Sequence, residues 1–185
     1  MKHTLFVNLF GAPGSGKSTG ASFVFSQLKM NGIDCEYISE YAKDKCWELN
    51  KTIFESPENQ FYIGAKQFYR LNCIDGKVDV CITDSPIFLN AFYNNSEFLG
   101  KEYNSVMLRL FNKFNNINFF LNRVKPYNSN GRNQTEQESN EIAKQIKKSL
   151  IENEISFLEE TGDMTGYYSI FHQIKGIIKN GYGNL

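Results

Sequence analysis

The sequence lacks an excess of charge of either sign, and it lacks an apolar run long enough to cross a membrane. Twenty Lys and Arg residues balance twenty Asp and Glu residues, so the formal net charge is zero. Proteins whose main ligand is a nucleic-acid backbone usually carry a basic surplus, so we expect neither nucleic acid nor a membrane as the partner. The first residues also lack the pattern of a secretory signal peptide, which predicts a soluble cytoplasmic protein.

Cysteine is scarce as well, and its spacing does not suit a metal site. The four cysteines form no C-x-x-C pair and no zinc-type pattern with the two histidines (Cys35, Cys46, Cys73 and Cys81). We interpret them as buried thiols of a protein in a reducing compartment. What the sequence has in quantity is hydrophobic side chains, at 41% of its 185 residues. This length and composition predict one domain with a substantial core, over residues 1–185.

The stretch NLFGAPGSGKSTGA, residues 8–21, contains the pattern G-x-x-x-x-G-K-[ST] of a phosphate-binding loop. It follows an apolar strand pattern and precedes an amphipathic helix pattern, as such a loop requires. Glycines allow backbone N–H groups to turn towards phosphate oxygens, and the positive end of the helix dipole adds attraction. We therefore predict a site for ATP and Mg²⁺, in which Lys17 neutralises the phosphates and Ser18 ligates the metal. The predicted nucleotide-binding residues are Gly11, Ala12, Pro13, Gly14, Ser15, Gly16, Lys17, Ser18 and Thr19.

Strand and helix patterns alternate along the rest of the chain. Short, mostly apolar runs at 34–39, 78–83, 117–121 and 155–158 predict strands, and the segments between them contain helical patterns. This alternation predicts an α/β fold with a five-stranded parallel sheet flanked by helices and right-handed crossovers. Segment 123–141 is too polar for the core and is placed to fold over a bound nucleotide.

Parallel sheets bind ligands at the carboxyl ends of their strands, so the residues that follow each strand are the candidates for chemistry. Asp84 ends the run VDVCITD and would hold Mg²⁺ through water or cap the next helix. Glu40 would take a proton from an attacking hydroxyl, hydrogen-bond a sugar hydroxyl, or cap a helix. Arg123 and Arg132, two of only four arginines, would stabilise charge on the transferred phosphoryl group or belong to a solvated surface loop.

Further candidates lie in ENQFYIGAKQFYR, residues 58–70. Helical spacing brings Gln60 and Gln67 to one face with Arg70 close by, and we expect Gln67 and Arg70 to contact the acceptor. The aromatic residues Phe61, Tyr62 and Phe68 are more typical of core positions at this spacing.

Five motifs together resemble the P-loop kinases of the nucleoside and nucleotide branch: GAPGSGKST, SEYAKDKCWE, NQFYIGAKQ, ITDSP and the pair Gly131-Arg132. More narrowly, they resemble the kinase domain of bacterial ribosylnicotinamide kinases and related small ATPases found in phages, from residue 4 to roughly 175. The resemblance implies an ATP:acceptor phosphotransferase with a mobile lid over about 123–141. It implies Asp84 as the acidic residue after the strand and Arg123 and Arg132 as lid arginines. Tyr41 and Trp47 are the candidates for the family's aromatic acceptor-binding residue.

We therefore expect an ATP- and Mg²⁺-dependent kinase of a small nucleoside-like or nucleotide acceptor, as a monomer or homodimer. A hydroxyl acceptor is favoured, because Arg70 alone provides little charge for a doubly charged phosphate, with Lys43 or Lys66 as the alternative sources of that charge. The alternatives are a deoxynucleoside monophosphate kinase, a polynucleotide 5′-end kinase and a regulatory ATP-binding protein.

Overall fold

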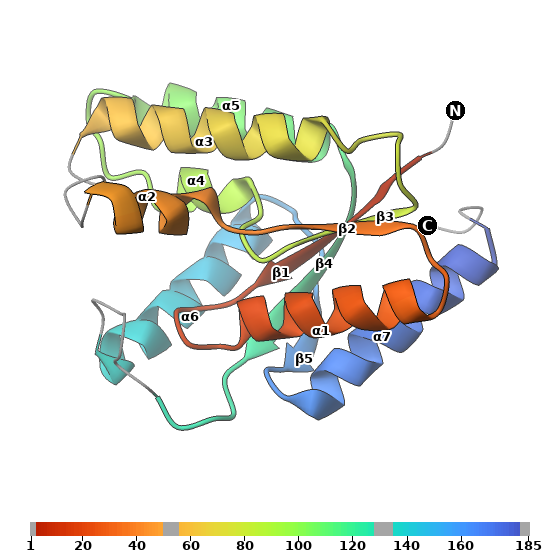
Figure 1. The fold of residues 1–185 in the computed structure, drawn as a ribbon. Helices are drawn as coiled ribbons and strands as arrows, with labels where there is room; N and C mark the ends of the chain where they lie inside the picture. Colours follow the sequence, from red (N-terminus) through yellow and green to blue (C-terminus); the bar gives the residue numbers. More distant parts are fainter. Residues whose placement is uncertain (1–2, 50–55, 128–134, 182–185) are drawn as a thin grey trace.

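A computed structural model of the chain describes residues 3–49, 56–127 and 135–181, without the side chains of 46–49. These residues form a five-stranded sheet with helices packed on both faces (Figure 1). The strands are β1 (Leu5–Phe10), β2 (Cys35–Ile38), β3 (Val80–Thr83), β4 (Asn115–Asn122) and β5 (Leu158–Thr161). The helices are α1 (Lys17–Met30), α2 (Tyr41–Leu49), α3 (Pro57–Asn72), α4 (Phe88–Phe92), α5 (Gly100–Asn112), α6 (Glu136–Glu152) and α7 (Met164–Lys179).

The sheet has the order β2-β3-β1-β4-β5, and every neighbouring pair of strands is parallel. β1 lies at its centre, with Val7 opposite Ile82 of β3 on one side and Ile117 of β4 on the other. All six residues of β1 are buried, which explains why this strand is almost entirely apolar. Because the strands are parallel, their carboxyl ends meet along one edge of the sheet.

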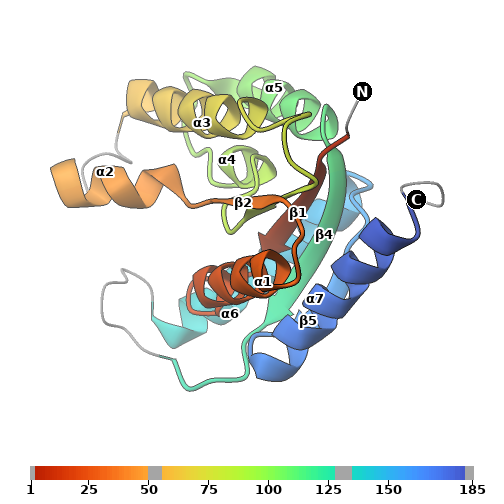
Figure 2. The same cartoon turned by 45° about the vertical axis from the view of Figure 1, so that its right-hand side comes forward.

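Alternate side chains of β1 enter two separate cores. Leu5, Val7 and Leu9 pack with α1 and α7, whereas Phe6 and Phe10 pack with helices α3 to α6. The sheet is therefore the middle of three layers, as the turned view in Figure 2 shows. Among the described residues, no helix is both long enough and apolar enough to span a membrane.

The predicted parallel five-stranded α/β sheet is confirmed, with one strand misplaced. The last strand was expected at 155–158, but β5 covers Leu158–Thr161. Ile155 instead ends the turn after α6, where its N–H donates to the carbonyl of Leu150. The strand itself reads LEET and lies at the edge of the sheet, so it lacks the apolar pattern on which the prediction relied.

The interval 123–141, expected to form a lid, is partly helical. α6 already begins at Glu136, where Thr135 caps the helix and Glu138 completes a capping box. Residues 128–134, which contain Arg132, lie outside the described part of the chain.

Candidate active site

The phosphate loop connects the end of β1 to the first residue of α1. Its three glycines have positive φ angles of 142° for Gly11, 82° for Gly14 and 93° for Gly16. Residues with a Cβ rarely adopt such angles, and a Cβ on Gly11 would also lie 2.9 Å from the carbonyl oxygen of Leu121. The conformation of the loop thus depends on the glycines that the motif supplies.

Two side chains of the loop are placed for an anion. The ammonium of Lys17 donates to the carbonyls of Gly11 at 2.7 Å and Ala12 at 3.2 Å, so it lies at the loop itself. Ser15 is 2% exposed, and its hydroxyl finds no hydrogen-bond partner within the described residues. A buried hydroxyl without a partner is costly, which is consistent with a loop built to meet a ligand.

Asp84 lies beside the loop at the end of β3 and is only 4% exposed. Its Oδ1 accepts the backbone N–H of Glu40 at 3.1 Å. The alternative role of Asp84 as a helix cap is wrong, because α4 begins only at Phe88 and Ile87 occupies its N-cap.

The side chain of Tyr37 lies close to those of Asp84 and Ser18. The phenol of Tyr37, in β2, lies next to both, and its pKa is raised by burial and by the carboxylate of Asp84. Ser18 itself is exposed at the start of α1. Magnesium in phosphate sites is held by one or two protein oxygens together with substrate phosphates, and the oxygens of Ser18 and Asp84 fit this chemistry. Within the described residues, no group of three acidic, histidine or cysteine side chains forms a self-sufficient metal site.

Glu40 follows β2, and its backbone N–H contacts Asp84. Burial raises the pKa of its carboxyl; Lys17 opposes this rise, and the negative charge of Asp84 adds to it. Tyr93, just after α4, retains 41% exposure, and the partial burial of its phenol together with the charge of Glu40 raises its pKa to about 12. The structure thus brings Lys17, Glu40 and Asp84 together, as the sequence predicted.

Gln67 and Arg70, both in α3, hydrogen-bond to the residues at the ends of β2 and β3. Gln67 is 1% exposed; its amide nitrogen donates to Thr83 and Ser85, and its oxygen accepts the N–H of Tyr41. The guanidinium of Arg70 donates to the carbonyl of Ser39 at 2.8 Å. Both side chains therefore fix the ends of β2 and β3.

Tyr41 stands at the start of α2 in an aromatic and cationic cluster. Its hydroxyl donates to that of Tyr62 at 2.9 Å, and their rings lie 5.7 Å apart, edge to face. The ammonium of Lys45 lies over both rings, and Arg70 lies over that of Tyr41. Phe61 and Tyr62 are 55% and 47% exposed, so the expectation that they belong to the core is wrong. The side chain of Trp47 lies outside the described residues.

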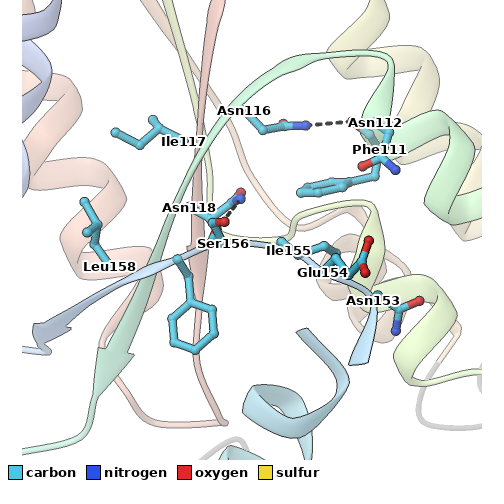
Figure 3. A pocket seen from close by; sticks show the side chains of 11 residues that line it. Phe111, Asn112, Asn116, Ile117, Asn118, Asn153, Glu154, Ile155, Ser156 and Leu158 are labelled. Atoms are coloured by element: carbon cyan, nitrogen blue, oxygen red, sulfur yellow. Dashed lines mark hydrogen bonds between the residues drawn. The ribbon is translucent and has the colours of Figure 1, made fainter. Parts of the chain in front are cut away.

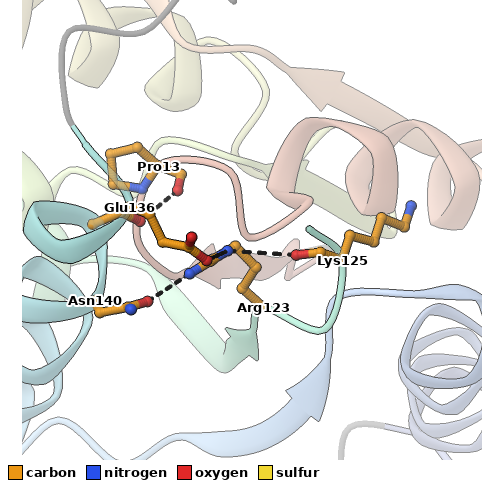
Figure 4. A network of polar contacts seen from close by, with 6 residues as sticks. Pro13, Arg123, Lys125, Glu136 and Asn140 are labelled. Carbon is orange, nitrogen blue, oxygen red and sulfur yellow. Dashed lines mark hydrogen bonds and ion pairs between the residues drawn. The ribbon is translucent and has the colours of Figure 1, made fainter. Parts of the chain in front are cut away.

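Arg123 is held against the start of α6 (Figure 4). It donates to Glu136 at 2.7 Å and to Asn140 at 2.6 Å. The same helix contacts the phosphate loop, because Ser139 donates to the carbonyl of Pro13 at 2.8 Å. Arg123 is therefore near the loop but engaged by α6.

A hollow of about 550 Å³ lies at the amino ends of β4 and β5, the opposite end of the sheet (Figure 3). Its central amides already bond within the protein: Asn116 and Asn118 both accept from Asn8, and Asn118 donates to the carbonyl of Ser156. The amides of Asn116 and Asn118 are thus committed to the fold, and the phosphate loop lies at the other end of the sheet.

Tyr37, Tyr93 and Tyr167 were missed by reasoning from the sequence. Tyr37 could have been found, because it lies two residues after Cys35, on the same face of the strand that leads to Glu40. Tyr93 follows α4 and lies close enough to Glu40 for that charge to act on its phenol, and Tyr167 of α7 donates to the carbonyl of Gly16, so both come from distant segments that no local pattern marks.

The fold and the loop together define a P-loop nucleotide-binding protein. Residues 6–165 match the family described as AAA domain, and the chain belongs to that family. No curated protein matches the sequence.

Solved structures show the same fold. The NadR protein in complex with NAD and AMP-PNP has a TM-score of 0.70 at 12% identity, over 99% of this chain. The NadR protein in complex with NR has a TM-score of 0.71 at 13% identity. The Mycobacterium tuberculosis APS kinase CysC, with AMPPNP and APS, has a TM-score of 0.50 at 14% identity, over 97% of this chain and 98% of its own. The present chain spans about half the length of the NadR chain. At 12–14% identity these matches confirm the resemblance at the level of the fold.

Proposed function

We propose that this protein transfers a phosphoryl group from ATP to a hydroxyl of a small nucleoside-like acceptor. The observation that carries the proposal is the position of Glu40, which is partly buried and lies close enough to Lys17 and Asp84 for both charges to act on its carboxyl. A carboxylate beside a phosphate loop can accept the proton of an attacking hydroxyl. Its raised pKa brings it closer to neutrality, where a general base is most effective.

Each residue then has a role in positioning or charge. Lys17 neutralises the phosphate that is transferred, and Glu40 orients the acceptor hydroxyl and takes its proton. Ser18 and Asp84 would hold Mg²⁺, which, when bound, withdraws charge from the phosphate oxygens. Arg123 and Arg132 remain proposed partners of the phosphates, with Arg123 leaving Glu136 to reach them.

The contacts of Arg70 favour a hydroxyl over a phosphate as acceptor. An acceptor monophosphate would need cations close to Glu40, because the two negative groups repel one another. Arg70, the arginine expected there, donates instead to Ser39 and Gln67, which leaves Lys43, together with Lys17, as a cation whose charge acts on Glu40. Tyr41, with Tyr62 and Lys45 around it, offers an aromatic surface for the ring of a nucleoside.

One observation favours a second candidate, a polynucleotide 5′-end kinase. Aromatic side chains that lie exposed beside lysines are the chemistry that binds single strands by stacking and charge. Tyr62 and Tyr69 of α3 are 47% and 59% exposed, with Lys45 over the former and Lys66 over the latter. This surface continues from Tyr41, next to Glu40.

ATP consumption in the presence of different acceptors tests these proposals. The screen includes nucleosides, nicotinamide riboside, deoxynucleoside monophosphates and a short 5′-hydroxyl oligonucleotide, with Lys17→Ala as the inactive control. Consumption that requires a nucleoside supports the proposal. Consumption with the oligonucleotide that weakens steeply with salt favours the second candidate. Consumption with monophosphates alone contradicts both, and ATP binding without transfer indicates a regulatory protein.

A further inference from the structure

Tyr167 lies in the first turn of α7 and is 1% exposed, yet its hydroxyl reaches the phosphate loop, 151 residues away in sequence. Its Oη lies 3.0 Å from the carbonyl oxygen of Gly16 and 3.0 Å from that of Gly162. A phenol has a single O–H donor, so the two carbonyls share it. Tyr167 thereby joins the last residue of the loop to the turn between β5 and α7.

Two glycines make room for this side chain. A Cβ on Gly16 would lie 2.3 Å from the hydroxyl of Tyr167, and a Cβ on Gly20 would lie 2.7 Å from its ring. Gly20 lies inside α1, where glycine weakens a helix relative to alanine. The close contact with Tyr167 gives a physical reason for a glycine there.

The turn after β5 presses on the loop from the same side. A Cβ on Gly162 would lie 2.0 Å from the carbonyl oxygen of Ser15, and the N–H of Gly162 donates to Asn122 at 2.8 Å. The backbone of Gly162 packs directly on the backbone of the loop, so a small rotation of a peptide plane in the loop would change its contact with Gly162. The hydroxyl of Tyr167 is the side-chain group that ties these two segments together.

We propose that Tyr167 is a positioning residue for the phosphate loop. The carbonyl of Gly16 and the N–H of Lys17 belong to one planar peptide unit, so the group that fixes the carbonyl also fixes the direction of the N–H. That N–H opens α1 and belongs to the cradle in which the loop would hold phosphate. Tyr167 itself does not touch the nucleotide. The inference rests on the proposed function, because it assumes that the loop binds ATP.

Tyr103 provides a matched control for the loss of the Tyr167 hydroxyl. It is 5% exposed, its hydroxyl donates to the carbonyl of Gln60 at 3.1 Å, and a Cβ on Gly64 would lie 2.3 Å from that hydroxyl. Tyr103 lies in α5, on the other face of the sheet from Tyr167. Tyr167→Phe and Tyr103→Phe therefore remove the same kind of buried hydrogen bond from two different places.

The experiment measures ATP affinity by calorimetry at fixed Mg²⁺, together with the unfolding midpoint of each variant. We expect Tyr167→Phe to weaken ATP and ADP binding about three- to tenfold, which corresponds to one hydrogen bond. We expect AMP binding to change less, because the loop contacts the outer phosphates. Tyr103→Phe should lower the unfolding midpoint similarly and leave ATP affinity within about twofold of wild type.

A second pair of variants tests the contact from the other side. Gly20→Ala should displace the ring of Tyr167 and weaken ATP binding, whereas Gly64→Ala should not. Unchanged ATP affinity in Tyr167→Phe, or equal losses in both tyrosine variants, would overturn the inference while wild type still binds ATP. A wild-type protein that binds no ATP would instead overturn the proposed function, and this inference with it.

Discussion

Replacing Glu40 with glutamine should make the protein more stable and less active at neutral pH. The substitution keeps the shape of the side chain and removes its charge. In the wild type, burial and the carboxylate of Asp84 destabilise that charge. The attraction of Lys17 does not compensate fully, because the pKa of Glu40 remains raised. A raised pKa means that the folded state disfavours the ionised form of the carboxyl.

The sign of the stability effect follows from proton binding. Between the unfolded pKa of glutamate, about 4.3, and the raised folded value, the native state binds more protons than the unfolded state. Stability contributed by Glu40 is therefore present at low pH and lost as pH rises through this window. Above the window, each unit of the shift costs the wild type about 1.4 kcal/mol, or about 3–5 °C in the unfolding midpoint of a chain of this size.

Thermal unfolding from pH 4 to pH 8, with turnover measured alongside, provides the assay. Glu40→Gln should unfold at a higher temperature than wild type at pH 8, with the gain disappearing towards pH 4. Turnover with a nucleoside should fall by about 10²–10⁴-fold, the usual loss for a general base. Glu36→Gln is the control, since Glu36 lies in β2, just before Glu40, but its side chain is 46% exposed and pairs with Lys29 at the surface. A glutamine variant that is less stable at pH 8 would show that ionised Glu40 does not destabilise the fold, and a fully active variant would show that Glu40 is not the general base.

Three further substitutions test other parts of the site. Lys17→Ala should abolish transfer while changing the free energy of unfolding by less than about 1 kcal/mol, measured by denaturant titration; an unfolded or active variant would count against the loop assignment. Asp84→Asn should slow turnover by orders of magnitude and raise the Mg²⁺ concentration needed for half-maximal rate, and normal Mg²⁺ dependence would exclude the metal role. Glu136→Gln should release Arg123 from its ion pair and lower the KM for ATP by up to about fivefold, the usual contribution of a partly exposed ion pair. An unchanged KM would show that Arg123 serves the fold alone.

The parts of the site that were predictable are those encoded by neighbouring residues. The loop from Gly11 to Ser18 is a contiguous pattern, and Glu40 and Asp84 each follow an apolar strand directly. Given a parallel sheet, the ends of adjacent strands must meet, and β2 and β3 are indeed adjacent. Local patterning and one topological rule therefore sufficed for the centre of the site.

What the sequence could not provide are the contacts between distant segments. Whether Gln67 faces a ligand or the fold depends on Thr83, Ser85 and Tyr41, which fill its hydrogen bonds. The contact between Tyr167 and Gly16 joins opposite ends of the chain, and helical periodicity shows only that Tyr167 is buried. The position of β5 was predicted wrongly because an edge strand needs no apolar alternation.

The most direct test of the account is the identity of the phosphorylated product. Protein, ATP, Mg²⁺ and a nucleoside are incubated together, and ADP and the nucleoside monophosphate are quantified by mass spectrometry, with Lys17→Ala and Glu40→Gln in parallel. We expect one nucleoside monophosphate for each ADP, and little of either product with the two variants. ADP that forms with free phosphate and without a phosphorylated nucleoside, or transfer to monophosphates with Glu40→Gln fully active, would contradict the proposed function.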